Sequence, residues 1–107
     1  MSEALARLRA TRAGNRSVIT RLIDETDKIL GSASFDKGRL KTIANLLEEK
    51  LKYVEDLDNQ ILEACGLEEI EGEIEASAAT VSRVLDAQRK ISEITKPSPV
   101  EIPPQLP

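Results

Sequence analysis

The side chains that could do chemistry in this sequence are carboxylates and guanidinium groups, because the chain has no histidine and a single cysteine, Cys65. Without histidine, the chain lacks the general base of a catalytic triad and the Cys/His ligand sets of zinc sites. Its five glycines are scattered and form no phosphate-binding loop. We therefore predict a protein that is not an enzyme and that binds no cofactor or metal.

Basic residues near the start of the chain have two interpretations. An arginine-rich helix suits RNA, but the formal net charge of -4 disfavours a nucleic-acid partner. Acidic residues follow at 55–63 and 68–75, which an up-down-up bundle places beside the first helix. Internal charge complementarity is the favoured interpretation, and nucleic-acid binding stays the weaker alternative. The arginines concerned are Arg7, Arg9, Arg12, Arg16 and Arg21.

The elements that position these charges are predicted from apolar residues repeating at steps of three and four, which is typical of amphipathic helices. Three such segments are separated by breaks near 31–36 and at Gly66. The predicted inward positions are Leu5, Leu8, Ile19, Leu22 and Ile29 in the first segment, Leu40, Ile43, Leu47, Leu51, Val54, Leu57 and Ile61 in the second, and Leu67, Ile70, Ile74, Ala78, Val81, Leu85 and Ile91 in the third.

The three segments fit one another as an antiparallel bundle. Folding the chain back at each break sets apolar residues of one segment against apolar residues of the next, for example Leu57 against Ile74. We predict an all-α, coiled-coil-like, antiparallel three-helix bundle over residues 1–96. All five prolines lie in residues 97–107, which predicts a disordered proline-rich tail or linker.

Arg12 falls on the inward side of the first segment, at the level of Leu57 and Ile74. A cation there must reach the rim or find a partner, because an unpaired buried charge is costly. We predict an internal charge cluster in which Arg12 pairs with Asp58 or Glu75. In this register an Arg12→Leu substitution should be tolerated, because it would extend the apolar seam.

Val84 and Ile94 widen the third seam beyond what two facing helices need. We predict that they form a candidate association surface, with the chain itself or another helical protein as partner and weak homo-oligomers as the result. No apolar window of the sequence is long enough to cross a bilayer, so we expect no membrane partner. One cysteine and no apolar signal segment predict a cytoplasmic setting.

Several stretches resemble the N-terminal, Gag-like region of BEL/Pao-type LTR retrotransposon polyproteins. They are the basic run at 8–14 with the step at 18–22, the helical stretches at 46–51 and 67–71, and the Leu-Pro junction at 101–107. The resemblance covers nearly the whole chain and depends mainly on the order of its parts. It implies an isolated N-terminal piece that helps polyprotein chains associate, with no catalytic residue carried over. The alternative is a stand-alone coiled-coil adaptor or scaffold of cellular origin.

Overall fold

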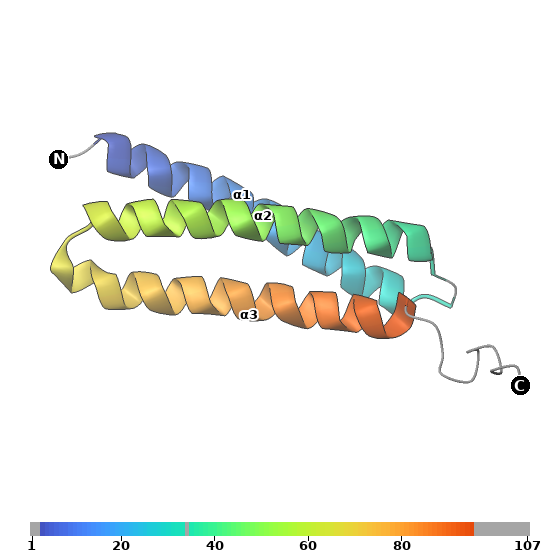
Figure 1. Cartoon of the computed structure of the whole chain (residues 1–107). Helices are drawn as coiled ribbons and strands as arrows, with labels where there is room; N and C mark the ends of the chain where they lie inside the picture. The colour runs from blue at the N-terminus through green and yellow to red at the C-terminus, as the bar shows by residue number, and fades with distance from the viewer. Residues whose placement is uncertain (1–2, 34, 96–107) are drawn as a thin grey trace, which may run out of the picture.

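The computed structural model of the chain describes residues 3–33 and 35–95. Helices α1 (Glu3–Leu30), α2 (Lys37–Ala64) and α3 (Ile70–Thr95) follow one another, with a short 3₁₀ helix, η1 (Leu67–Glu69), before α3. No residue in these two ranges belongs to a strand. The predicted antiparallel three-helix bundle and both breaks are confirmed (Figure 1). The predicted disordered tail, residues 97–107, lies outside the described residues.

Local hydrogen bonds define the two turns. The Asp36 carboxylate accepts the Arg39 backbone N–H at 3.0 Å and caps the start of α2. At the other turn, the Glu69 carboxylate accepts the Gly66 N–H at 3.2 Å, while the Gly66 carbonyl accepts the Glu69 N–H at 2.9 Å. These contacts fix the residues at which α2 and the segment formed by η1 and α3 begin.

The core is aliphatic and runs along the bundle between the three helices. The inward positions predicted in the middle of α1 and along α2 are confirmed, with Leu51 of α2 partly buried. Thr26, which interrupts the α1 seam, is buried and donates its hydroxyl to the Leu22 carbonyl at 2.9 Å. Its polar group is thereby satisfied within the helix. The core cluster consists of Ile19, Leu22, Leu40, Ile43, Leu47, Val54, Val84, Ala87 and Ile91.

The inward face of α3 differs from the prediction. Ile74 and Leu85 were predicted to be inward but are more than half exposed, whereas their neighbours Glu73 and Val84 point inward. The helix is therefore turned by about one residue, or roughly 100°, from the predicted register. The residues that α3 buries most deeply are Thr80, Val84, Ala87 and Ile91.

Electrostatics explains why α3 buries the face that carries Glu73 and Ser77 and not the predicted face. Glu73 and Ser77 lie on the inward face of α3, where they contact charged groups of α1 and α2. The alternative register would turn these polar partners to the solvent and leave buried charges unmatched, which is costly. Apolar burial alone does not select the face that α3 buries, because the face that carries Ile74 and Leu85 is also rich in aliphatic residues.

Candidate association surface and internal charge cluster

An internal charge cluster joins all three helices in the half of the bundle that contains the α2–α3 turn. Arg12 of α1 donates to Asp58 of α2 at 3.0 Å and to Glu73 of α3 at 2.5 Å. The three side chains are only 10%, 7% and 13% exposed, respectively. The cluster therefore connects three separate segments through charges that are largely removed from water, where an ion pair interacts more strongly than at the surface.

Further polar groups surround this centre. Arg16 lies 3.4 Å from Asp58, and the Ser77 hydroxyl donates to the other oxygen of the same carboxylate. Arg9 lies 3.1 Å from Glu69 and 3.4 Å from Glu73. Three arginines from successive turns of α1 thus face three carboxylates from α2, η1 and α3. This arrangement specifies which ends of the helices meet.

The structure confirms one predicted partner of Arg12 and corrects the other. Asp58 pairs with Arg12 as predicted, but Glu75 is exposed, and Glu73 occupies the predicted place. The change has the same cause as the rotation of α3, since Glu73 and Glu75 lie on different faces of one helix. A signal for the correct register was present in the sequence: Ile70, Ser77, Val84 and Ile91 are spaced seven residues apart.

Arg12 and Glu73 stay ionised near neutral pH. Burial lowers the pKa of Arg12, but its hydrogen bonds to Glu73 and Asp58 outweigh burial and leave that pKa raised. The hydrogen bond from Arg12 lowers the pKa of Glu73. Burial, together with the neighbouring Arg12 charge, lowers the pKa of Arg16. An arginine and a carboxylate with a lowered pKa are suited to structural pairing and poorly matched to proton transfer near neutral pH.

The arginines of α1 also line a shallow surface cavity of about 510 Å³. Four of its lining residues are Arg9, Arg12, Arg16 and Arg21. The first three already pair with carboxylates of the same chain, which reduces the positive charge that a phosphate backbone would meet. This pairing favours internal complementarity over nucleic-acid binding as the role of the basic run.

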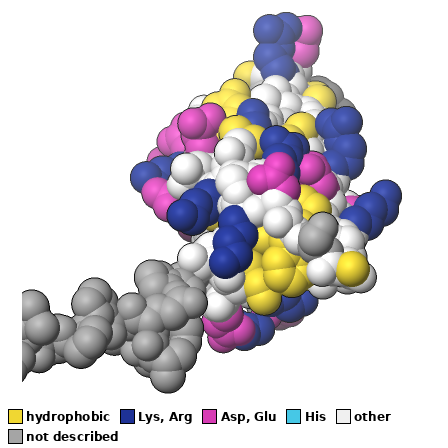
Figure 2. Space-filling model, turned by 90° about the vertical axis from the view of Figure 1, so that its right-hand side faces the viewer, with side chains coloured by type: hydrophobic (Ala, Val, Ile, Leu, Met, Phe, Trp, Pro, Cys, Tyr) yellow, Lys and Arg dark blue, Asp and Glu magenta, His cyan; other side chains and the backbone are white. Residues whose placement is uncertain are grey.

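The predicted association surface, Val84 and Ile94, is corrected by the structure. Val84 is fully buried in the core, so no partner can contact it while the bundle stays folded. Ile94 lies near the end of α3 and packs partly against the core. Figure 2 views this end of the bundle and shows hydrophobic side chains among charged ones. Both residues pack within the bundle, because the observed inward face of α3 differs from the predicted face by about one residue.

Another set of apolar residues is exposed instead. Leu67, Ile74 and Leu85 are 86%, 52% and 54% exposed, and Ala78 and the partly buried Val81 lie between them in sequence. Successive members of this set are seven, four, three and four residues apart, which places them along one side of η1 and α3. We call these five residues the outer stripe.

The outer stripe borders the groove between α2 and α3. At one end, Ile74 lines a shallow cavity of about 480 Å³ together with Asn59 and Leu62 of α2. Beyond the other end, Gln88 donates to the Ala44 carbonyl at 3.2 Å, which closes that side of the two helices. The stripe and the neighbouring edge of α2 therefore form one continuous face, away from the α1 arginines.

Other kinds of site are not found in the described ranges. Among residues 3–33 and 35–95, no group of three or more cysteine, aspartate or glutamate side chains is placed to hold a metal ion. None of the helices in this part of the chain is long and apolar enough to span a membrane. The features that call for an explanation are thus the charge cluster and the outer stripe.

Comparison with known proteins finds no relative from which a function can be transferred. The chain matches no protein-family model, no curated protein and no solved structure. The resemblance to BEL/Pao polyproteins consequently rests on the sequence stretches themselves, and the role of the outer stripe is inferred from its residues.

Proposed function

We propose that the chain is a non-catalytic protein–protein association module that binds a helical partner along the outer stripe. The observation that carries this proposal is the exposure of Leu67, Ile74 and Leu85 on one side of the bundle. Single exposed aliphatic residues are ordinary on protein surfaces, but an aligned row of them marks an interaction site. The buried charge cluster supports the module by fixing which side of α3 is turned outward.

The spacing of the outer stripe indicates the kind of partner. Steps of three and four residues are those of the a and d positions of a coiled coil, which insert between side chains of a facing helix. A flat sheet or an extended peptide would not follow this spacing along the stripe. An amphipathic helix of the partner, lying along α3, is therefore the expected contact.

The resemblance to BEL/Pao polyproteins suggests a biological role for such a module. In this proposal the chain is Gag-like and helps polyprotein chains associate in the cytoplasm. Its one thiol, Cys65, is unpaired, which is consistent with a reducing compartment. A cellular coiled-coil adaptor would use the same outer stripe. Sequencing the locus beyond Pro107 separates these two origins, because protease or reverse-transcriptase motifs there would support the first alone.

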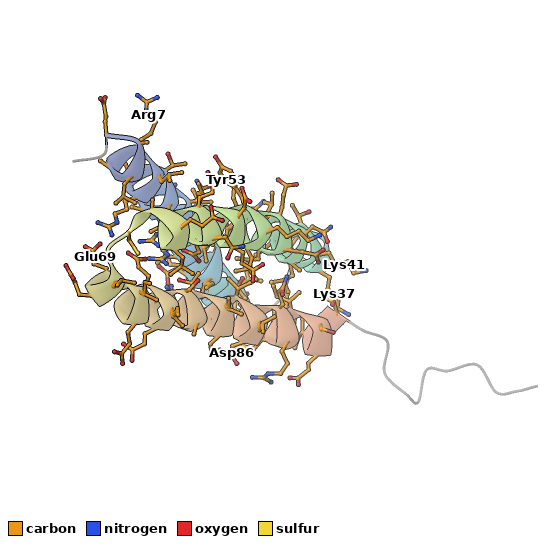
Figure 3. All side chains as sticks on the ribbon, turned by 60° about the vertical axis from the view of Figure 1, so that its left-hand side comes forward. Arg7, Lys37, Lys41, Tyr53, Glu69 and Asp86 are labelled. Carbon is orange, nitrogen blue, oxygen red and sulfur yellow. The ribbon has the colours of Figure 1, made fainter. Side chains whose placement is uncertain are left out.

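Affinity capture with matched variants tests the association function. Leu85→Asp places a charge on the outer stripe, whereas Tyr53→Asp makes the same change at an exposed residue that points away from α3 (Figure 3). We expect the wild-type chain and Tyr53→Asp to retain a helical partner, or further copies of the chain, from an extract. Leu85→Asp should lose it, and each captured protein should bind again after purification. Binding that is unaffected by Leu85→Asp would rule out the outer stripe.

A further inference from the structure

We infer that the cavity beside the charge cluster binds a single dianionic group, either free phosphate or a phosphate monoester, through Arg16, Arg21 and Arg83. The cavity measures about 510 Å³ and lies along α1. One of its lining residues, Thr20, is contacted by α3, which places the cavity on the side of α1 that meets α3. This site is separate from the outer stripe, so the inference does not depend on the proposed association function.

The cavity has more cations than the carboxylates that contact them. The charge cluster itself is balanced, because its three arginines of α1 meet three carboxylates. Arg21 also lines the cavity, and Arg83 of α3 donates to the Thr20 hydroxyl at 3.0 Å. Within residues 3–33 and 35–95, neither Arg21 nor Arg83 forms an ion pair. Two arginines at the cavity are thus without a carboxylate partner.

Hydrogen-bond donors at the cavity also lack acceptors. A guanidinium group has five N–H donors in one plane. Among the described residues, Arg16 uses only Nη2, in a long contact of 3.4 Å with Asp58, and its Nε is shielded from water without a partner. The Ser17 hydroxyl lines the same cavity. A phosphate group has several acceptor oxygens and nearly two negative charges at neutral pH, and it matches the planar donors of arginine.

Arg16 is the residue that gains most from such an anion. Burial, and then the neighbouring charge of Arg12, lower the pKa of Arg16. Its charged form is disfavoured because it shares the Asp58 carboxylate with Arg12, which lies closer to that carboxylate. A dianion beside Arg16 offsets this repulsion, so binding corrects a charge imbalance that is already present in the folded chain.

Carboxylates at both ends of the cavity limit the ligand to one anionic group. Glu69 and Glu73 lie at the end that contains Arg9. Asp24 follows Thr20 by about one helical turn at the other end. A nucleic-acid backbone carries a phosphate at every nucleotide and would bring further phosphates against these carboxylates. The site therefore fits a small phosphorylated molecule better than RNA.

The openness of the cavity to solvent sets the expected affinity. Arg21 and Arg83 are exposed, so water and salt screen their charges. A dissociation constant of about 1 mM for phosphate is the expected scale. Loss of one exposed cation should weaken binding about 5-fold, and loss of both should weaken it about 20-fold.

Titration of the isotope-labelled full chain with inorganic phosphate, followed by NMR at constant ionic strength, tests this site. We expect saturable shifts of the Ser17 and Thr20 amide signals. Arg21→Gln and Arg83→Gln should each weaken binding, and the double variant should weaken it most, while all three keep the wild-type melting temperature. Arg7→Gln is the matched control on α1, since Arg7 points away from the other helices, and it should leave the affinity unchanged (Figure 3).

A parallel titration with phenyl phosphate distinguishes the two sources of the phosphate group. Equal affinity assigns the site to the phosphate group alone, and tighter binding of phenyl phosphate assigns it to a phosphorylated molecule; both results support the inference. Shifts that do not saturate, or that persist unchanged in the double variant, overturn it. A short single-stranded RNA that binds more tightly than phenyl phosphate, and loses affinity with Arg7→Gln as well, would replace the single-group site with nucleic-acid binding along the whole basic run.

Discussion

Arg12→Leu is expected to lower the free energy of unfolding strongly, in contrast to what the apolar pattern alone predicts. The substitution leaves Asp58 and Glu73 largely buried without their shared cation. Removing one partner of a buried ion pair costs about 3–5 kcal/mol. We expect the lower part of this range, because Arg16 and Arg9 still lie 3.4 Å from the two carboxylates. Thermal or urea unfolding followed by circular dichroism measures the loss.

The same substitution at Arg9 provides the control for the Arg12 prediction. Arg9 lies on the same helix but is more exposed, so Arg9→Leu should cost no more than about 1 kcal/mol. Adding Asp58→Asn and Glu73→Gln to Arg12→Leu should recover much of the lost stability, because no buried charge then remains unpaired. Equal stability of Arg12→Leu and the wild type would show that α1 does not face α2 and α3 as described.

The pH dependence of the Arg12→Leu effect gives a second readout. Arg12 lowers the pKa of Glu73 in the folded chain. The stability from this pairing is therefore full above the ordinary glutamate pKa and is lost as the pH falls through the lowered one. The difference in stability between wild type and Arg12→Leu should accordingly shrink between about pH 7 and pH 3. A difference that grows on acidification would contradict the pairing.

Val84→Asp and Leu85→Asp should differ sharply in stability although the residues are neighbours. Val84 is fully buried, so a carboxylate there is desolvated without a partner and should cost more than about 4 kcal/mol. Leu85 is more than half exposed, and its replacement should change stability by about 0.5 kcal/mol or less. Chemical denaturation measures both variants, and Val84→Ala provides a milder version if Val84→Asp does not fold. If Leu85→Asp instead lowered stability more than Val84→Asp, the result would support the α3 register predicted from the apolar pattern.

Most of the architecture was predictable from the sequence because its signals agree with one another. In α2, every position that the three-and-four pattern selects is buried or partly buried, and Asp36 caps the helix where the pattern begins. Helix α1 was also assigned correctly, including the inward position of Arg12. When a helix has one apolar face and residues that mark its ends, its position and its inward side can be predicted without knowing which helices pack against it.

Helix α3 was not predictable in this way because it carries two apolar faces. One contains Val84 and Ile91 with the polar residues Glu73 and Ser77, and the other contains Ile74 and Leu85. Counting aliphatic residues selects the second face. The folded chain buries the first, since Glu73 and Ser77 satisfy charges on α1 and α2 that only the tertiary structure brings within reach. The predicted association surface was wrong for the same reason.

Site-specific photo-crosslinking tests the outer stripe as the association surface most directly. A benzophenone amino acid replaces Leu85 in one variant and the exposed Tyr53, on the other side of α2, in a control variant. On irradiation of the chain in an extract, the Leu85 position should form covalent adducts with a helical partner or with further copies of the chain, and the Tyr53 position should not. Crosslinks from the Tyr53 position, or dimers linked through α1, would contradict association through the outer stripe.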